Sequence, residues 1–363
     1  MPSRPTYASI LTPAGRGAVA TVAVHGPQAA ELVARRLVVG EKQPPTLDLG
    51  RIRLRQFRGL AGSTEELIVV VISPEDVEIH CHGGPAAANA IAEALAAEGA
   101  QRIDWQQWAE LVDDDLIRAE ARLALAEART ERTCAILLDQ YRGALAAALA
   151  QIEQLLDAGQ RQAAQERLAR LQSLATCGSH LTRPWQVVLA GAPNVGKSSL
   201  INALVGYQRA IVFDQPGTTR DVLAAATAVD GWPVELMDTA GLRGPVDALE
   251  AAGIEQTRRQ LAQADIVLAI EDVSLPSAPA NELPASAIAV LNKCDLLSAS
   301  LREQRLAQSP HACLVSAKTG EGLDQLCAAI SRQLVPAIPL PGEAVPFTPR
   351  QLDLFESLSA TRV

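Results

Sequence analysis

The chain has 363 residues, a length that predicts about two or three domains rather than one. Its formal net charge of −9 argues against a protein that coats nucleic acid nonspecifically, because phosphate binding depends on Lys and Arg, although a local basic patch remains compatible. The six cysteines form no CxxC pair, and apolar runs such as residues 67–72 are too short to cross a bilayer. We therefore expect a cytoplasmic protein with no signal peptide and no membrane association.

The first stretch of the chain, to about residue 102, has a mixed pattern. Residues 19–24 and 67–72 are short apolar runs rich in Val and Ile, which predict strands. Residues 86–97 are rich in Ala and end at Gly99, which predicts a helix. An N-terminal α+β domain over residues 1–102 follows from this pattern.

The segment from Asp104 to about residue 179 contains no proline, and its apolar residues recur at spacings of three and four. This periodicity predicts a set of long amphipathic helices, broken near Gly159. The tail after residue 336 begins Pro-rich and ends in a helix-like run at 350–358. We assign residues 103–183 together with 337–363 to one helical domain.

After Pro184 the pattern changes to alternating strands and helices. Predicted strands lie at 185–190, 234–237, 266–270, 288–291 and 312–315. Predicted helices lie at 199–204, 253–262 and 323–334. The alternation predicts a mostly parallel sheet with helices on both faces over residues 184–336. The whole chain is thus a multidomain α/β protein in which this domain is inserted in, or follows, a helical domain.

A phosphate-loop pattern, G-x-x-x-x-G-K-S, runs from Gly191 to Ser198. It follows a predicted strand and opens a predicted helix, which is the context that such a loop needs. Backbone N–H groups of the loop can converge on phosphates, Lys197 can reach the β- and γ-phosphates, and the Ser198 hydroxyl can ligate Mg²⁺. The alternative is a Gly-rich turn without a ligand. The nucleotide-binding residues predicted here are Asn194, Val195, Gly196, Lys197, Ser198 and Ser199.

Three further motifs follow strands in the same domain. The first is Asp238, Thr239, Ala240 and Gly241, which can hold a Mg²⁺ water and donate an N–H group to the γ-phosphate. The second is Asn292, Lys293 and Asp295, whose carboxylate can accept both N–H groups of the guanine edge. The third is Ser316, Ala317 and Lys318, which can donate a backbone N–H to the guanine O6. Each alone could be a turn, but their order predicts a P-loop GTPase that binds and hydrolyses GTP.

These residues resemble the translation-factor class of GTPases, and the resemblance can be narrowed. Leu242 stands where Ras-like proteins carry the glutamine that orients water, so another route to the attacking water is required. With the Pro-Gly-Thr-Thr-Arg-Asp run at 216–221, this is similar to GTPases that use potassium, and among them to the tRNA modification GTPase MnmE (TrmE) family. Residues 12–17 and the segment 75–85, which contains His-Gly-Gly-Pro, are similar to that family's N-terminal signatures.

The resemblance implies roles for further residues. Asn194 would bind K⁺ with backbone carbonyls of Phe213 and Gln215 and the hydroxyl of Thr218. Thr219 would be the second Mg²⁺-linked hydroxyl, and Glu250 would orient the attacking water; the alternative for Glu250 is an exposed glutamate at a helix start. Lys197 completes the catalytic set. The loop expected to bind the nucleotide and K⁺ is Phe213, Asp214, Gln215, Pro216, Gly217, Thr218 and Thr219.

The resemblance also implies partners: a homodimer formed by the N-terminal domain, tRNA modified at its wobble uridine, and a flavoprotein of the MnmG type. Glu78 would contact a folate such as 5-formyltetrahydrofolate. The family's folate-contacting Arg and Lys fall at Ala23 and near Asp113, and no cysteine follows Cys327, where the family has a C-terminal cysteine motif. Two alternatives therefore stay open: a GTP-dependent interaction module without tRNA-modifying chemistry, and a ribosome-assembly GTPase.

His80, Cys81 and His82 could suggest a metal site, because alternate residues of a strand share a face. Only these three candidate ligands cluster in the sequence, so we expect a strand-and-turn role there instead.

Overall fold

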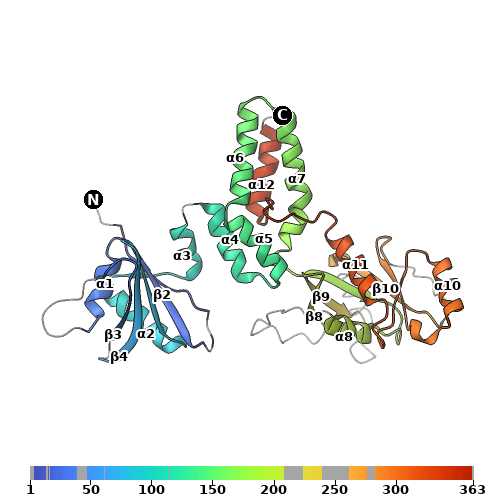
Figure 1. The fold of residues 1–363 in the computed structure, drawn as a ribbon, viewed down its shortest axis with the longest axis horizontal. Coiled ribbons are helices and arrows are strands. Elements are labelled where there is room, and N and C mark those ends of the chain that lie inside the picture. The colour runs from blue at the N-terminus through green and yellow to red at the C-terminus, as the bar shows by residue number, and fades with distance from the viewer. Residues whose placement is uncertain are drawn as a thin grey trace, which may run out of the picture. The chain divides into compact units, whose positions relative to one another are not determined.

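The computed structural model describes all residues except 1–3, 14, 16, 39–46, 61, 114, 208–223, 239–260, 276–282 and 362–363, and it describes side chains up to residue 355. The chain forms two compact units, Met1–Ala119 and Glu120–Val363 (Figure 1). Each unit has a sheet of its own.

The N-terminal unit is a six-stranded sheet with the order β3-β4-β5-β2-β1-β6. Its neighbours pair antiparallel, except for β1 and β6, which are parallel. Two helices, α1 and α2, pack on it, and α3 follows. The bounds are β1 Tyr7–Ile10, β2 Val19–His25, α1 Ala29–Arg36, β3 Ile52–Arg58, β4 Thr64–Ser73, β5 Asp76–His82, α2 Pro85–Ala97, β6 Gln101–Arg102 and α3 Trp105–Val112.

Alternation along the strands gives this unit its core. On β5, Val77, Ile79 and Cys81 are buried and their neighbours lie on the other face. The many alanines of α2 let this helix approach the sheet closely, with Ala88 and Ala94 buried. Both predicted strands and the predicted helix are confirmed, with ends extended by a few residues.

The boundary between the two units falls within helix α4, Leu116–Glu127. The second unit continues with the helices α5 Glu131–Tyr141, α6 Ala144–Asp157 and α7 Arg161–Ser179. The predicted break near Gly159 is confirmed, but the prediction of long helices is wrong before residue 144. Thr130 caps α5 by accepting a hydrogen bond from the Thr133 N–H, and Gly143, with a φ of 98°, separates α5 from α6. Such stops interrupt a helix even where apolar spacing continues, because they change the backbone and not the hydrophobic pattern.

The C-terminal segment packs back onto these helices. Helix α12, Pro349–Thr361, contacts α7 and lies beside it in Figure 1. The segment that precedes α12 is bonded to α5: the buried side chain of Gln140 donates to the Glu343 carbonyl at 3.0 Å and accepts from the Val345 N–H at 3.1 Å. The Arg170 guanidinium makes a two-pronged bond to the Glu343 carboxylate at 2.7 and 2.9 Å. The second sheet, which lies between residues 185 and 314, is therefore inserted between two parts of a helical bundle.

The inserted sheet has the order β12-β11-β10-β7-β9-β8. All neighbours are parallel except β8 and β9. Helix α8 packs against β8 and β9, and α11 packs against β10 and β11. The bounds are β7 Trp185–Ala190, α8 Lys197–Tyr207, β8 Ala224–Val229, β9 Trp232–Asp238, β10 Ile266–Asp272, β11 Ile288–Asn292, α10 Ala299–Gln308, β12 Cys313–Leu314 and α11 Leu323–Leu334.

All five predicted strands of this sheet and two of its three predicted helices are confirmed. The third predicted helix, at 253–262, falls almost wholly outside the described residues. The central strands read as continuous apolar runs because helices cover a parallel sheet on both faces. On β7, for example, Val187, Val188 and Leu189 are all fully buried.

Candidate nucleotide-binding site

The phosphate loop joins the central strand β7 to helix α8, which begins at Lys197. Lys197 is only 5% exposed. Its Nζ donates hydrogen bonds to the carbonyl oxygens of Gly191 at 3.0 Å and Ala192 at 3.1 Å. The loop thus curls around the ammonium group at the start of a helix, which is an arrangement that attracts phosphate.

Gly196 is required by the shape of this loop. Its φ is 97°, and a Cβ atom there would lie 2.4 Å from the Nδ2 atom of Asn292. No side chain fits so close to another loop. The glycine therefore lets the guanine-side loop touch the phosphate loop.

Ser198 and Asp238 come together at the same edge of the sheet. The Ser198 Oγ donates to the Asp238 Oδ2 at 2.8 Å, with one residue opening α8 and the other ending β9. Hydroxyl and carboxylate oxygens are the ligands that Mg²⁺ prefers. The residues present therefore fit a magnesium ion bound beside Lys197.

The guanine-side loops meet the phosphate loop through Asn292, which is 1% exposed. Its Nδ2 donates to the Val195 carbonyl at 2.9 Å, and its Oδ1 accepts from the Ala317 N–H at 3.1 Å. The buried Ser316 hydroxyl donates to Asp295 Oδ1 at 2.6 Å. Lys318 follows as an exposed residue. The structure thus brings together the phosphate loop and the loops at 292–295 and 316–318, which are far apart in the sequence.

One residue of this site was missed by sequence reasoning. Asp272, at the end of β10, accepts a hydrogen bond from the Lys293 Nζ at 2.7 Å. Burial disfavours the charged carboxylate, but hydrogen bonds from Lys293 and Ser274 outweigh it and hold the pKa of Asp272 below its ordinary value. The signal was an acidic residue at the carboxyl end of a strand, since ligands bind at that edge of an open α/β sheet.

Several predicted site residues lie outside the described residues, and their roles stay predictions. They are Phe213, Asp214, Gln215, Pro216, Gly217, Thr218, Thr219, Thr239, Ala240, Gly241 and Glu250.

The N-terminal sheet offers a poor fit for a folate. Glu78 lies opposite Ala23 on β2, and its Oε2 is 3.3 Å from the Nε2 of His80. At the second expected cation position, Asp113 is paired with Arg118 at 3.3 Å. An anionic folate tail needs cationic partners, and an alanine and a paired aspartate supply none.

The histidines of this sheet are held by hydrogen bonds. His80 Nδ1 is 3.0 Å from the Thr21 hydroxyl, and His82 Nδ1 is 2.6 Å from Glu65 Oε1. Within the described residues, no group of three or more His, Cys, Asp or Glu side chains could hold a metal ion.

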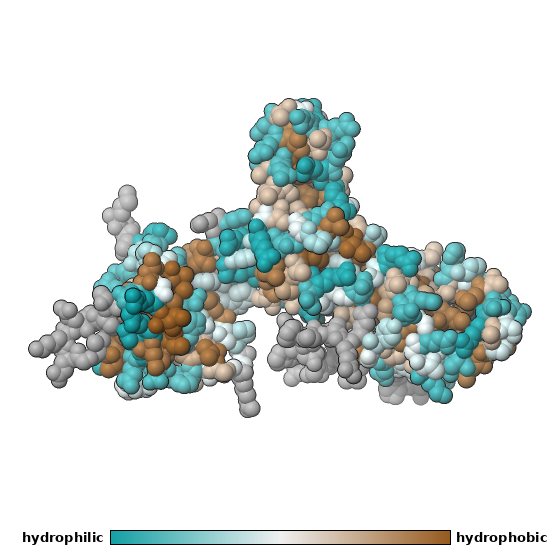
Figure 2. Space-filling model, viewed as in Figure 1, coloured by the Kyte–Doolittle hydropathy of each residue, from teal (hydrophilic) through white to brown (hydrophobic). Residues whose placement is uncertain are grey.

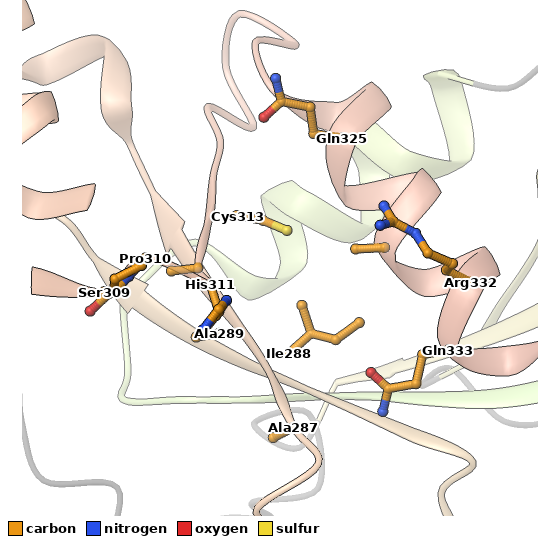
Figure 3. A pocket seen from close by; sticks show the side chains of 12 residues that line it. Ala287, Ile288, Ala289, Ser309, Pro310, His311, Cys313, Gln325, Arg332 and Gln333 are labelled. Carbon is orange, nitrogen blue, oxygen red and sulfur yellow. The ribbon is translucent and has the colours of Figure 1, made fainter. Parts of the chain in front are cut away.

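A separate hollow of about 730 Å³ lies near the amino ends of β11 and β12, with Arg332 and Gln325 of α11 beside it (Figure 3). The nucleotide motifs follow the carboxyl ends of the same strands. This hollow is therefore not the nucleotide site.

Comparison with known proteins agrees with this geometry. A family model described as "GTP-binding protein TrmE N-terminus" matches residues 6–104, and one described as "50S ribosome-binding GTPase" matches residues 186–298. The tRNA modification GTPase MnmE of Chloroflexus aurantiacus is 35% identical over 91% of this chain and 82% of its own length. The Thermus thermophilus protein of the same name is 35% identical over 90% of this chain and 82% of its own length. The chain belongs to the tRNA modification GTPase MnmE family.

In this MnmE-family chain, the region matched at 6–104 lies in the first compact unit and the region matched at 186–298 lies in the second. Among solved structures, the G domain of the T. maritima FeoB iron transporter is 26% identical, and the match covers 42% of this chain and 99% of that one, with a TM-score of 0.31. In the described part of this MnmE-family chain, no helix has the length and apolar character needed to cross a membrane.

Proposed function

We propose that this protein binds GTP with Mg²⁺, hydrolyses it, and acts in the modification of the wobble uridine of tRNA. Membership of the MnmE family makes it a GTP hydrolase. The observation that carries the proposal is the contact of Ser198 with Asp238 at 2.8 Å beside the buried Lys197. At one edge of the sheet, this contact places a cation for the phosphates beside a hydroxyl that can bind Mg²⁺ and a carboxylate that can hold a Mg²⁺ water.

We assign each group of these residues a separate part of the nucleotide to bind. Lys197 would neutralise the β- and γ-phosphates, and the backbone N–H groups of Asn194 to Ser199 would cradle them. Ser198, with Thr219, would hold Mg²⁺, which neutralises charge on the phosphates when bound. Asp295, oriented by Ser316, would accept the two N–H groups of guanine.

Water activation and potassium are proposals that rest on the resemblance. Leu242 has no polar group with which to orient water, so we assign that role to Glu250. Asn194 is the described member of the K⁺ site, and it lies in the phosphate loop with its carbonyl held by Lys293. A cation at this place would offset charge that develops between the phosphates during hydrolysis.

We assign a homodimer interface to the N-terminal unit. Ile52 and Leu54 of the edge strand β3 are 72% and 59% exposed, and Ile72 of β4 is 55% exposed. In the strand register, Ile52 lies opposite Val70 and Leu54 opposite Ile68, so apolar side chains share one face. Figure 2 shows hydrophobic residues gathered on the surface of this unit. An apolar face at a sheet edge favours covering by a second copy.

The finer organisation is also a proposal. We assign residues 1–102 to the N-terminal domain, 184–336 to the GTPase domain, and 103–183 with 337–363 to the helical domain. The partners would be tRNA and a flavoprotein of the MnmG type, which would supply the redox step. The poor fit of Glu78, Ala23 and Asp113 to folate speaks against folate binding by this chain.

Nucleotide binding is tested with Lys197→Ala. Loss of the phosphate-neutralising charge should weaken GTP binding roughly a hundredfold or more in calorimetry. Arg142→Ala removes an exposed cation just after the end of α5 and serves as the control that should bind GTP normally. Near-normal affinity of Lys197→Ala would contradict the assigned phosphate site.

The tRNA role is tested by deleting the gene and measuring wobble-uridine nucleosides by mass spectrometry. Loss of the modified nucleoside, restored by the gene on a plasmid, is the expected outcome. Unchanged nucleosides would leave the second candidate, a GTP-dependent interaction module, which the altered Ala23 and Asp113 positions favour. Recovery of ribosomal particles without a flavoprotein in a pulldown would point to that candidate or to a ribosome-assembly GTPase.

A further inference from the structure

The carboxylate of Asp272 is fixed from both sides at the end of β10. Its side chain is 9% exposed. The Oδ2 atom accepts from the Lys293 Nζ at 2.7 Å. The Oδ1 atom accepts from the backbone N–H of Ser274 at 3.0 Å and from its hydroxyl at 2.6 Å. With both oxygens engaged, the carboxylate has one orientation, and it points to Lys293.

Lys293 continues from this carboxylate to the phosphate loop. Its Nζ also donates to the carbonyl oxygen of Asn194 at 2.8 Å. The preceding residue, Asn292, donates to the carbonyl of Val195 at 2.9 Å. Two consecutive residues, the last of β11 and the one that follows it, thus hold two consecutive carbonyls of the phosphate loop. Lys293 has a φ of 68° and Asn194 has a φ of 66°, so both ends of this link adopt a backbone that L residues rarely take.

A plain surface ion pair would contribute little here, because the Lys293 side chain is 33% exposed and its long stem is flexible. The contribution is expected to be larger because the Lys293 ammonium also donates a hydrogen bond to the Asn194 carbonyl. Without the carboxylate, Lys293 could turn toward water and release the Asn194 carbonyl. With the carboxylate, the ammonium is shared between an anion and a carbonyl and has few other positions.

We propose that Asp272 is a positioning residue for nucleotide binding, which holds Lys293 and through it the Asn194 carbonyl. The phosphate loop and the guanine loop are then joined before the nucleotide arrives, and less ordering is left to accompany binding. The inference rests on the proposed function, since it concerns the same GTP site. It predicts that GDP and GTP are affected alike, because both use the two loops that are joined.

A double-mutant cycle tests this role. Equilibrium dissociation constants for fluorescent GDP and a non-hydrolysable GTP analogue are measured for the full chain, Asp272→Ala, Lys293→Ala and the double variant. Asp272→Ala should weaken both nucleotides roughly tenfold. In the Lys293→Ala background, the Asp272→Ala change should cause no further loss, because the residue acts only through that lysine.

Glu303→Ala on α10 makes the same charge change at an exposed position and should bind both nucleotides normally. Asp272→Asn keeps the size of the side chain and should show an intermediate loss, which keeps the test readable if Asp272→Ala does not fold. Unchanged affinity of both Asp272 variants, or an equal loss in both backgrounds, would overturn the proposal. Failure of the unmutated chain to bind nucleotide would instead contradict the proposed function.

Discussion

Asn194 combines three properties within the phosphate loop: a positive φ, a carbonyl held by Lys293, and an amide side chain able to ligate a cation. Asparagine tolerates this left-handed backbone better than most residues. A backbone held in this way sets the direction from which the side chain leaves the loop. The residue is therefore suited to a fixed coordinating role.

The potassium proposal is tested at this residue. Hydrolysis should be faster in KCl than in NaCl at equal ionic strength, roughly tenfold or more, because Na⁺ is too small for a site built from carbonyls at K⁺ distance. Asn194→Ala should remove the difference and leave GTP affinity largely intact. Glu250→Ala should slow hydrolysis in both salts. Equal rates in the two salts for the unmutated protein would contradict the potassium mechanism.

At the scale of the elements, the buried ring of His180 connects the end of α7 to Trp185, the first residue of β7. His180 stacks on Trp185 with ring centroids 3.6 Å apart, and its Nε2 lies 3.7 Å from Asp265 Oδ1. Burial lowers the pKa of His180 below its ordinary value; Asp265 opposes this shift and Arg183 adds to it. The ring is therefore neutral in the fold at neutral pH, and the unfolded chain binds a proton more readily.

This joint should make the fold sensitive to acid. Stability should be full above the ordinary pKa of 6.5 and should fall as the pH drops below it, because only the unfolded state takes up the proton easily. His180→Phe keeps the stacking on Trp185 and removes the titration. In denaturant unfolding, its loss of stability from about pH 7.5 to about pH 5.5 should be smaller than that of the unmutated chain. An identical loss in both proteins would count against this role.

Some helices and strands could be predicted from the sequence and others could not, for physical reasons. Strands such as β7 were found because burial on both faces leaves a continuous apolar run. The loops predicted to bind the nucleotide could be proposed because phosphate and guanine each demand particular residues after a strand. The helix breaks before residue 144 and the role of Asp272 were missed. A cap at Thr130, and an ion pair from the end of β10 to Lys293, depend on contacts that the spacing of residues does not record.

At the scale of the whole molecule, the exposed face of the N-terminal sheet should decide the oligomeric state. Replacing Ile52 and Leu54 with Glu puts charge on the apolar face and should shift the full-length chain from dimer to monomer in sedimentation. Leu306→Glu, at a position 36% exposed on α10, is the matched control and should stay dimeric. Monomeric behaviour of the unmutated chain at high concentration would remove the interface.

The return of the C-terminal segment to the helices has a consequence for synthesis on the ribosome. The Gln140 side chain bonds to the Ile136 carbonyl on its own helix, but its two other backbone partners, in Glu343 and Val345, lie 203 and 205 residues later in the chain. Helices α5 to α7 are therefore made long before the segment that satisfies this buried amide, and the entire GTPase sheet must leave the ribosome in between. Domains generally fold as they emerge, so the sheet can assemble while the bundle around it is still incomplete. We therefore expect closure of the bundle to be a late step, because its two parts are so far apart in the sequence.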